Sequence, residues 1–215
     1  MATAPALTPD LVLLAYGQGI FPMAESRHDT GVFWVDPERR GIIPLRGFHI
    51  SRSLRRTLHS GRFAVSFDTA FDDVMQGCAD RPETWINADI RRVYGALHAA
   101  GHAHSVEVRE DGLLVGGVYG VSLGGAFFGE SMFSRRTDAS KVALAYLLDR
   151  LALAGFTLFD TQFLTQHLAS LGGKEVSRAA FRRMLRDALD LQADFAAAGS
   201  VPAPYDVIQR SAQTS

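Results

Sequence analysis

Hydrophobic and polar positions divide the chain into a short first part and a longer second part. Near the start, Thr8-Pro9-Asp10 has the order of an N-cap, a first-turn proline and an early acidic residue, which predicts a helix. Over residues 31–45, short apolar segments alternate with prolines and glycines and predict small strands and turns. We therefore expect residues 1–50 to form a small N-terminal domain. The buried stripe of its helix is predicted to hold Leu11, Leu14 and Ala15.

The centre of the chain has the pattern of an antiparallel meander. Residues 104–108 alternate between apolar and polar, and residues 113–121 and 126–132 are largely apolar. Asp111-Gly112 and Gly124-Gly125 stand between these segments, and glycine-containing pairs of this kind favour tight hairpin turns. Three consecutive antiparallel strands are therefore predicted.

Helical segments surround this meander. Ser51, Asp68, Asn87 and Ser177 each precede a stretch with helical periodicity and are predicted N-caps. A further apolar helix is predicted over residues 138–154, where Gly155 follows as a terminating residue.

Two shorter apolar runs, residues 63–67 and 156–159, predict additional strands. A mixed, largely antiparallel sheet flanked by helices, which is an α+β fold, accommodates this order of elements. We expect this second domain to cover residues 51–198. Residues 199–215 contain prolines and serines and are predicted to form a frayed C-terminal tail.

Composition narrows the class of protein. The 215 residues are 47% hydrophobic, which is enough to build a folded core. The start has no basic segment followed by an apolar run and a cleavage site, and no stretch approaches the roughly 18 apolar residues of a membrane span. A cytoplasmic protein without a membrane segment is therefore expected. The single cysteine, Cys78, is expected to be a buried thiol. No metal site is expected, because His102, His104 and His167 lack metal-ligand spacing.

Positive charge is concentrated in one segment although the net charge is only −1. Residues 39–67 contain seven arginines, two histidines and no carboxylate. Arg52, Arg55 and Arg56 recur at helical spacing, so one helix face should be basic. Such a face either binds phosphate groups or is simply solvated, and the pattern alone does not separate the two. Ser134 to Lys141 adds three basic residues before a helix N-terminus, a natural place for an anion.

Several common catalytic motifs are absent from the sequence. It has no Walker-type phosphate loop, no G-x-S-x-G elbow, no H-E-x-x-H pair and no G-x-G-x-x-G after a strand, which argues against a nucleotide-cofactor enzyme. Polar residues do interrupt apolar strand ends at Glu130, Asp160 and Gln162. If its strand persists, Asp160 and Gln162 point to one face. Taken alone, the three residues fit a structural hydrogen-bond network better than a catalytic site.

Seven short motifs follow one another between about Leu11 and Leu185. They are Gly19-Ile20-Phe21-Pro22, Trp34-Val35-Asp36-Pro37, Thr84-Trp85-Ile86, Gly101-His102-Ala103-His104-Ser105, Gly129-Glu130-Ser131-Met132-Phe133-Ser134, Ala139-Ser140-Lys141 and Asp160-Thr161-Gln162. In this order they closely resemble the bacterial leucyl/phenylalanyl-tRNA–protein transferases.

The resemblance implies an acetyltransferase-like (GNAT-like) main domain behind a small N-terminal domain. It implies transfer of Leu or Phe, and less readily Met, from aminoacyl-tRNA to the N-terminal Arg or Lys of acceptor proteins, which marks them for degradation. It also implies a monomer that needs no cofactor.

The resemblance also assigns roles to residues of this chain. The catalytic positions fall on Gln162, Asp160 and Glu130. Substrate-contacting aromatics fall on Trp85, Tyr94 and Phe127, and the apolar aminoacyl pocket on Val118, Phe127, Met132 and Leu147. Met23 stands where some members have a tryptophan that contacts the terminal adenosine, so Trp34 is a second candidate for that contact. Thr165 stands where the family has an asparagine. Contacts with the tRNA backbone are expected from Arg52, Arg55, Arg56 and Arg62.

A mechanism follows as an expectation. An amino terminus has a pKa of about 7.7 to 8, so part of it is neutral at cellular pH and needs no strong base. The carbonyl oxygen of Gln162 is expected to accept a hydrogen bond from the attacking amine, while Asp160 polarises the Gln162 amide and attracts the emerging ammonium. Glu130 is expected to orient the donor α-amino group or the ribose.

Three other functions share parts of this pattern. An acyl-CoA-dependent transferase normally has a glycine-containing pyrophosphate loop, and Arg135 to Lys141 has no glycine. A tRNA-dependent ligase of peptidoglycan cross-bridges shares the donor and differs in the acceptor. A non-catalytic tRNA-binding module would not need Glu130, Asp160 and Gln162, which are present.

Overall fold

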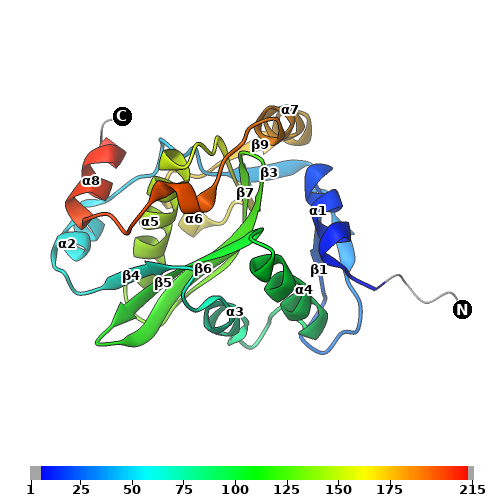
Figure 1. The fold of residues 1–215 in the computed structure, drawn as a ribbon, viewed down its shortest axis with the longest axis horizontal. Helices are drawn as coiled ribbons and strands as arrows, with labels where there is room; N and C mark the ends of the chain where they lie inside the picture. The colour runs from blue at the N-terminus through cyan, green and yellow to red at the C-terminus, as the bar shows by residue number, and fades with distance from the viewer. Residues whose placement is uncertain (1–5, 213–215) are drawn as a thin grey trace, which may run out of the picture.

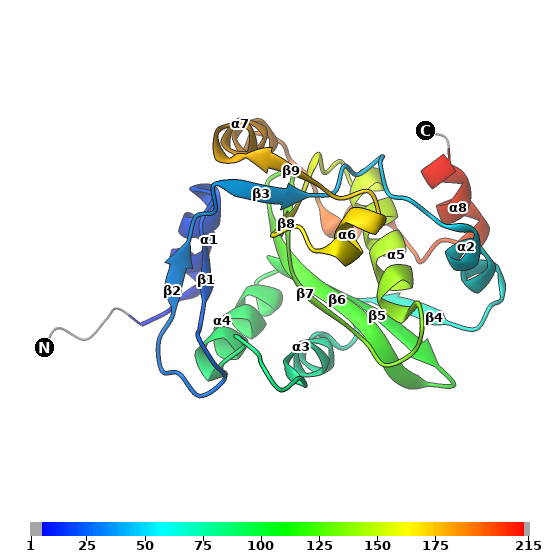
Figure 2. The same cartoon turned by 180° about the vertical axis from the view of Figure 1, so that it is seen from behind.

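The computed structural model describes residues 6–212, which form one large sheet with helices on both faces (Figures 1 and 2). The sheet has seven strands in the order β4-β5-β6-β7-β8-β3-β9. All neighbouring strands are antiparallel except β7 and β8, which are parallel, so the predicted mixed, largely antiparallel sheet is confirmed. The strands are β3 (Arg39–Ile42), β4 (Ala64–Phe67), β5 (Ala103–Glu110), β6 (Leu113–Leu123), β7 (Ala126–Ser134), β8 (Leu158–Gln162) and β9 (Lys174–Ser177).

Two separate hydrophobic cores lie on the two faces of this sheet. Because side chains alternate along a strand, neighbouring residues such as Phe127 and Phe128 are buried in different cores. One core packs against α1 (Pro9–Gly17), α3 (Phe71–Ala79), α4 (Ala88–Ala99) and α7 (Arg178–Leu189). The other packs against α2 (Arg52–His59), α5 (Ala139–Leu153), α6 (Gln166–Ser170), the 3-10 helix η1 (Phe195–Ala198) and α8 (Pro204–Ala212).

The N-terminal part adds a second, small sheet. It consists of β1 (Phe21–Met23) and β2 (Phe33–Val35), which pair antiparallel. The next strand, β3, is already part of the large sheet, where it lies between β8 and β9. The predicted domain boundary at residue 50 stays a prediction.

Most predicted helix boundaries are confirmed by the cap contacts. The side chains of Thr8, Ser51, Asn87 and Ser177 each accept a hydrogen bond from a first-turn backbone N–H of α1, α2, α4 and α7. The three meander strands are confirmed as β5, β6 and β7. The last predicted strand was placed two residues early at its start, since β8 begins at Leu158.

Two local predictions are wrong. Leu14 is 64% exposed, and the buried positions of α1 are Val12, Ala15 and Tyr16. Asp68 does not cap α3, because its carboxylate instead accepts hydrogen bonds from the backbone N–H of Ser105 and pairs with the ring of His104. A long-range partner therefore replaces the local cap.

The predicted frayed tail is also wrong over residues 199–212, where α8 packs against the core. Val207 and Ile208 are buried, at 1% exposure each. Arg210 of α8 forms a two-point ion pair with Asp149 of α5, with N–O distances of 2.6 and 2.8 Å. The composition signal failed because two apolar residues and one ion pair are enough to dock a short helix. Residues 213–215 of the predicted tail lie outside the described residues.

Docking of α8 predicts a stability difference between two substitutions in one helix. Ile208→Ala should lower the free energy of unfolding by about 2–5 kcal/mol, because it removes buried apolar atoms and leaves a cavity. Tyr205→Ala, at a side chain that is 60% exposed, should change it by less than about 0.5 kcal/mol. Urea denaturation of both variants measures this difference, and equal small effects would mean that α8 does not dock.

Candidate functional site

A cavity of about 280 Å³ opens where strands β7 and β8 part. The parallel pairing of the two strands ends at Phe128 and Asp160. Beyond that point Glu130 and Gln162 face each other across the gap and are joined by a side-chain hydrogen bond of 2.8 Å. Six of the predicted site residues line the cavity together: Met23, Trp85, Val118, Glu130, Met132 and Gln162.

Gln162 has a strained backbone that fixes its side chain. Its φ is 62°, a left-handed conformation that costs a non-glycine residue roughly 1–3 kcal/mol. Its backbone N–H donates to Oδ1 of Asp160 at 2.8 Å, and its side-chain Nε2 donates to Oε1 of Glu130. With one amide N–H bound to Glu130, the carbonyl oxygen of Gln162 is available to accept a hydrogen bond from a substrate.

A glycine on the next strand makes room for this conformation. A Cβ on Gly41 of β3 would lie 2.7 Å from the carbonyl carbon of Phe163 and 2.8 Å from the backbone nitrogen of Leu164. These backbone atoms could not move away from a Cβ without distorting the turn. Gly41 therefore allows β3 to approach the turn that carries Gln162.

Glu130 is a buried acid in a ring of hydroxyl groups. Tyr16 Oη lies 2.5 Å from its Oε1, Tyr94 Oη lies 3.2 Å from its Oε2, and the two hydroxyls are 2.6 Å apart. Burial raises the pKa of Glu130 to about 8, although the hydrogen bonds from Tyr16 and Tyr94 act in the opposite direction. The acid is therefore largely protonated at neutral pH.

Asp160 is paired with a buried arginine rather than with the Gln162 amide. Both its carboxylate oxygens accept from Arg40, at 2.9 Å from Nε and 2.6 Å from Nη2. Asp160 reaches Gln162 only through the backbone N–H. The expectation that Asp160 polarises the Gln162 side-chain amide is therefore not met, because the amide nitrogen is bound to Glu130 and the Asp160 charge is neutralised by Arg40.

Arg40 is itself enclosed by aromatic rings. Its guanidinium lies 4.6 Å from the ring centre of Phe21 and 4.4 Å from that of Phe181, and Nη1 donates to the carbonyl of Gly19 at 2.9 Å. Cation–π contacts, and a hydrogen bond from each of the three guanidinium nitrogens, offset the cost of burying this charge.

The apolar wall of the cavity contains only part of the predicted pocket. Val118 and Met132 line it, whereas Phe127 and Leu147 are buried in the core and do not. Phe127 packs on Phe156, Phe159 and Phe195 and so supports the wall from behind. Sequence reasoning missed further apolar residues of the lining, among them Leu144, Phe159 and Leu168.

The predicted adenosine contacts separate into three positions. Met23 and Trp85 line the cavity, Tyr94 is buried with its hydroxyl on Glu130, and Trp34 lies on β2 and does not line the cavity. Phe163 lines the cavity and is 46% exposed. Sequence reasoning missed it because its exposure depends on the left-handed turn at Gln162.

Other site residues were missed as well. Tyr16 and Arg40 contact the predicted acids directly, and Arg81 lines the cavity while its Nη2 donates to Ser131 Oγ and the Met132 carbonyl, each at 3.1 Å. Tyr16 lies four residues after Val12 on the buried side of α1, so a correct helix stripe could have indicated it. Thr165, which replaces the expected asparagine, lines the cavity and caps α6.

The four predicted tRNA-backbone arginines differ in their surroundings. Arg52, Arg55 and Arg56 are exposed on α2, and their side chains make no hydrogen bond or ion pair with residues 6–212. Arg62 is instead paired with Glu110, at 2.5 Å.

Within residues 6–212, no group of three or more His, Cys, Asp or Glu side chains is arranged to hold a metal ion. None of the helices in this part of the chain is long and apolar enough to cross a membrane.

Comparison with known proteins gives consistent matches. The family profile of the leucyl/phenylalanyl-tRNA protein transferase matches residues 42–186, and the profile of its N-terminal domain matches residues 6–38. The leucyl/phenylalanyl-tRNA–protein transferase of Cereibacter sphaeroides is 63% identical over 99% of this chain and 100% of its own length, and that of Ruegeria pomeroyi is 62% identical over 98% and 100%.

Among solved structures, the crystal structure of FemX aligns with a TM-score of 0.48 and 11% identity, over 82% of this chain and 65% of that one. The two family profiles and the two near-full-length relatives agree with one another. This chain therefore belongs to the leucyl/phenylalanyl-tRNA–protein transferase family of aminoacyltransferase enzymes.

Proposed function

We propose that the chain transfers Leu or Phe, and less readily Met, from aminoacyl-tRNA to the N-terminal Arg or Lys of acceptor proteins and so marks them for degradation. The observation that carries this proposal is the family match over nearly the whole chain. In this proposal the enzyme acts in the cytoplasm as a monomer without a cofactor.

The proposed fold class is acetyltransferase-like, with a small N-terminal domain. The parallel pair β7 and β8, connected through α5 in an otherwise antiparallel sheet, supports it. Where the sequence pattern predicts that the N-terminal domain ends at residue 50, an end before β3 is proposed here as an alternative, since its family profile stops at residue 38 and β3 pairs with β8 and β9.

The aminoacyl group is proposed to enter the cavity between β7 and β8. A volume of about 280 Å³ lies just below the range of about 300–1,000 Å³ for ligand pockets, which suits one amino-acid side chain and part of a nucleoside. The side chain would contact Val118, Met132 and Leu144, and its ester carbonyl would lie near Gln162. Phe127 and Leu147 would then shape the pocket indirectly.

The terminal adenosine is proposed to bind at the rim formed by Met23, Trp85 and Phe163. Trp85 and Phe163 are aromatic residues that line the cavity, and stacking of a base on an aromatic ring is worth about 1–3 kcal/mol for each base. Phe163 thus offers the aromatic surface that Met23 lacks. Trp34 is a less suitable candidate because it does not line the cavity.

The reaction exchanges an ester for a peptide bond. The neutral amine of the acceptor attacks the ester carbonyl carbon, a C–N bond forms, the C–O bond to the ribose breaks, and the amine proton ends on the ribose hydroxyl. Because the ester is already activated, alignment of the two reactants is the main task of the protein. Gln162 would accept a hydrogen bond from the attacking N–H through its carbonyl oxygen.

Glu130 and Asp160 are proposed to position Gln162 rather than to transfer protons. If Oε2 of Glu130 carries a proton, it can donate to Tyr94, Tyr94 to Tyr16, and Tyr16 back to Oε1 of Glu130, which closes a ring of hydrogen bonds. Oε1 then also accepts from the Gln162 amide. This arrangement would keep the Gln162 carbonyl oxygen pointed away from Glu130.

Transfer of radiolabelled leucine from Leu-tRNA tests the function directly. Three reporter proteins that differ only in an N-terminal Arg, Ala or Asp should give label on the Arg protein alone. Absence of label on all three would refute the proposed reaction, and equal label on all three would refute the acceptor rule.

Gln162→Ala should lower kcat by about 10²-fold, the size expected when one aligned hydrogen-bonding group is lost from the transition state. The dissociation constant for Leu-tRNA should stay within about twofold, because the rest of the surface is intact. Gln166→Ala, the same chemical change at an exposed position four residues later, is the matched control. An unchanged kcat in the Gln162 variant would remove this residue from the mechanism.

The pKa of Glu130 predicts a pH-dependent stability. With a pKa of about 8 when folded and about 4.3 when unfolded, the folded protein holds a proton that the unfolded chain has released between these values. The free energy of unfolding should therefore fall as pH rises from about 5 to 8, relative to Glu130→Gln, by up to about 1.4 kcal/mol per pH unit. Denaturation of both proteins at several pH values measures the difference, and a flat difference would mean that Glu130 is ionised in the fold.

A further inference from the structure

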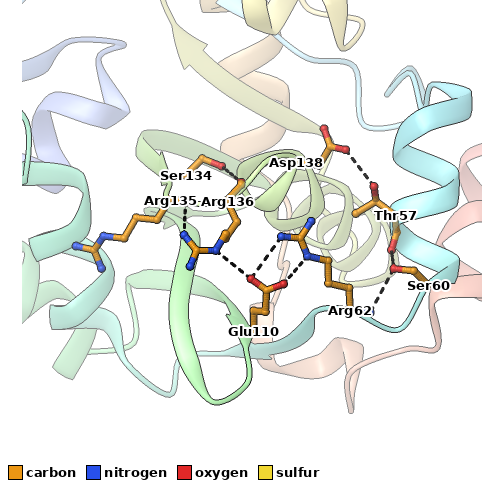
Figure 3. A network of polar contacts seen from close by, with 8 residues as sticks. All are labelled: Thr57, Ser60, Arg62, Glu110, Ser134, Arg135, Arg136 and Asp138. Carbon is orange, nitrogen blue, oxygen red and sulfur yellow. Dashed lines mark hydrogen bonds and ion pairs between the residues drawn. The ribbon is translucent and has the colours of Figure 1, made fainter.

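Glu110 binds two arginines that come from different parts of the fold (Figure 3). Arg62 Nε lies 2.5 Å from its Oε1, and Arg136 Nε lies 3.2 Å from its Oε2. Arg62 follows α2, Arg136 follows β7, and Glu110 is the last residue of β5. One carboxylate therefore holds two guanidinium groups close together although their charges repel.

The three side chains form an exposed group with a net charge of +1. Arg62 and Arg136 are 40% and 54% exposed, and Glu110 is 21% exposed. Hydrogen bonding from Arg62 lowers the pKa of Glu110, so the carboxylate is ionised at neutral pH. Ion pairs at this degree of exposure contribute little to stability, so another anion can compete for the same arginines.

This group lies next to the basic face of α2. Thr57 of α2 donates to Oδ2 of Asp138 at 3.0 Å, which joins α2 to the start of α5 (Figure 3). Lys141 of α5 pairs with Oδ1 of the same Asp138 at 2.8 Å. Arg62 lies three residues after the end of α2, so the group of Arg62, Arg136 and Glu110 stands beside the helix that carries Arg52, Arg55 and Arg56. The difference is that the arginines of α2 make no ion pair with described residues, whereas Arg62 and Arg136 share an internal one.

We infer that Arg62 and Arg136 form a binding site for one backbone phosphate of the tRNA, and that Glu110 competes with this phosphate and limits the affinity for tRNA. The inference rests on the proposed function, because it takes tRNA as the partner of this surface. A backbone phosphate has one negative charge on two non-bridging oxygens, and the carboxylate of Glu110 likewise has one negative charge on two oxygens. Guanidinium groups bind phosphates and carboxylates with similar geometry.

The distance from the catalytic cavity fits a contact away from the aminoacyl end. Arg136 lies six residues beyond Glu130, four of them on β7 and two in the bend that follows, so the two residues are at most about 20 Å apart at about 3.3 Å per residue. A phosphate at that distance belongs to a nucleotide several positions before the terminal adenosine. The contact would position the tRNA without reading its sequence.

Binding of deacylated leucine tRNA to the full chain, measured by fluorescence anisotropy between about 50 and 200 mM KCl, tests the inference, because each phosphate contact adds a slope of about −0.9. Glu110→Gln should bind roughly three- to tenfold more tightly at the lowest salt, with a salt slope steeper by about one contact. Gln keeps the shape and one acceptor oxygen of Glu110 and removes only its charge.

Two further variants separate the site from a general effect of charge. Arg136→Gln should bind roughly three- to tenfold more weakly with a shallower slope, and in Glu110→Gln/Arg136→Gln most of the gain should be lost. Asp10→Asn makes the same change of net charge on α1, at the opposite end of the molecule from α2, and should leave the affinity within about twofold (Figures 1 and 2).

Three results would overturn the inference: affinity of Glu110→Gln equal to or below that of the unchanged protein, an equal gain in Asp10→Asn, or no loss in Arg136→Gln. A purely structural role of the ion pairs predicts the first of these together with a lower melting temperature. If the unchanged protein transfers leucine and binds tRNA while Glu110→Gln behaves identically, the inference fails and the proposed function stands. If the unchanged protein binds no tRNA, both fail.

Discussion

The buried ion pair between Arg40 and Asp160 is the interaction on which the arrangement of the site depends. Asp160 fixes the backbone N–H of Gln162, and Arg40 contacts the Gly19 carbonyl and the rings of Phe21 and Phe181. One charge pair thus connects β1, β3, β8, α7 and the turn between α1 and β1. Replacing a buried pair by apolar side chains is often neutral, but removing one partner leaves an unpaired charge and costs about 3–5 kcal/mol. The pair therefore specifies geometry more than it adds stability.

The N-terminal segment also supplies side chains to the site. The hydroxyl groups of Tyr16 of α1 and Tyr94 of α4 are hydrogen-bonded to Glu130, and Met23 of β1 lines the cavity. Glu130 is neutral largely because these elements exclude water from it. A neutral acid can both donate and accept hydrogen bonds, which a carboxylate cannot, and this lets Glu130 hold the Gln162 amide while it takes part in a ring with two hydroxyls.

Local signals in the sequence were sufficient for the framework and for part of the site. Helix caps at Thr8, Ser51, Asn87 and Ser177 and the glycine turns of the meander depend on neighbouring residues, so periodicity and turn chemistry predicted them correctly.

Long-range contacts were the source of the errors. Asp68 is a residue type that often caps helices, but its carboxylate is bound by His104 and Ser105. The helix α8 is held by an ion pair with Asp149 of α5. The role of Arg40 depends on the position of β3 beside β8, which the local sequence does not indicate. Phe163 could not be identified as a rim residue, because its exposure follows from a left-handed glutamine that no local pattern requires.

The two electrostatic environments of the protein serve different steps of a transfer reaction. Within the cavity, burial, hydroxyl groups and one neutralised acid hold Gln162 in the orientation that the proposed mechanism requires for the aminoacyl ester. On α2 and beside it, the exposed arginines are proposed to contact phosphates that charged and spent tRNA share, and such binding energy would not distinguish substrate from product. An enzyme that must release spent tRNA gains nothing from making such uniform binding tighter. Partial neutralisation of Arg62 and Arg136 by Glu110 is a physical means of keeping that binding weak while the orientation of the tRNA is preserved.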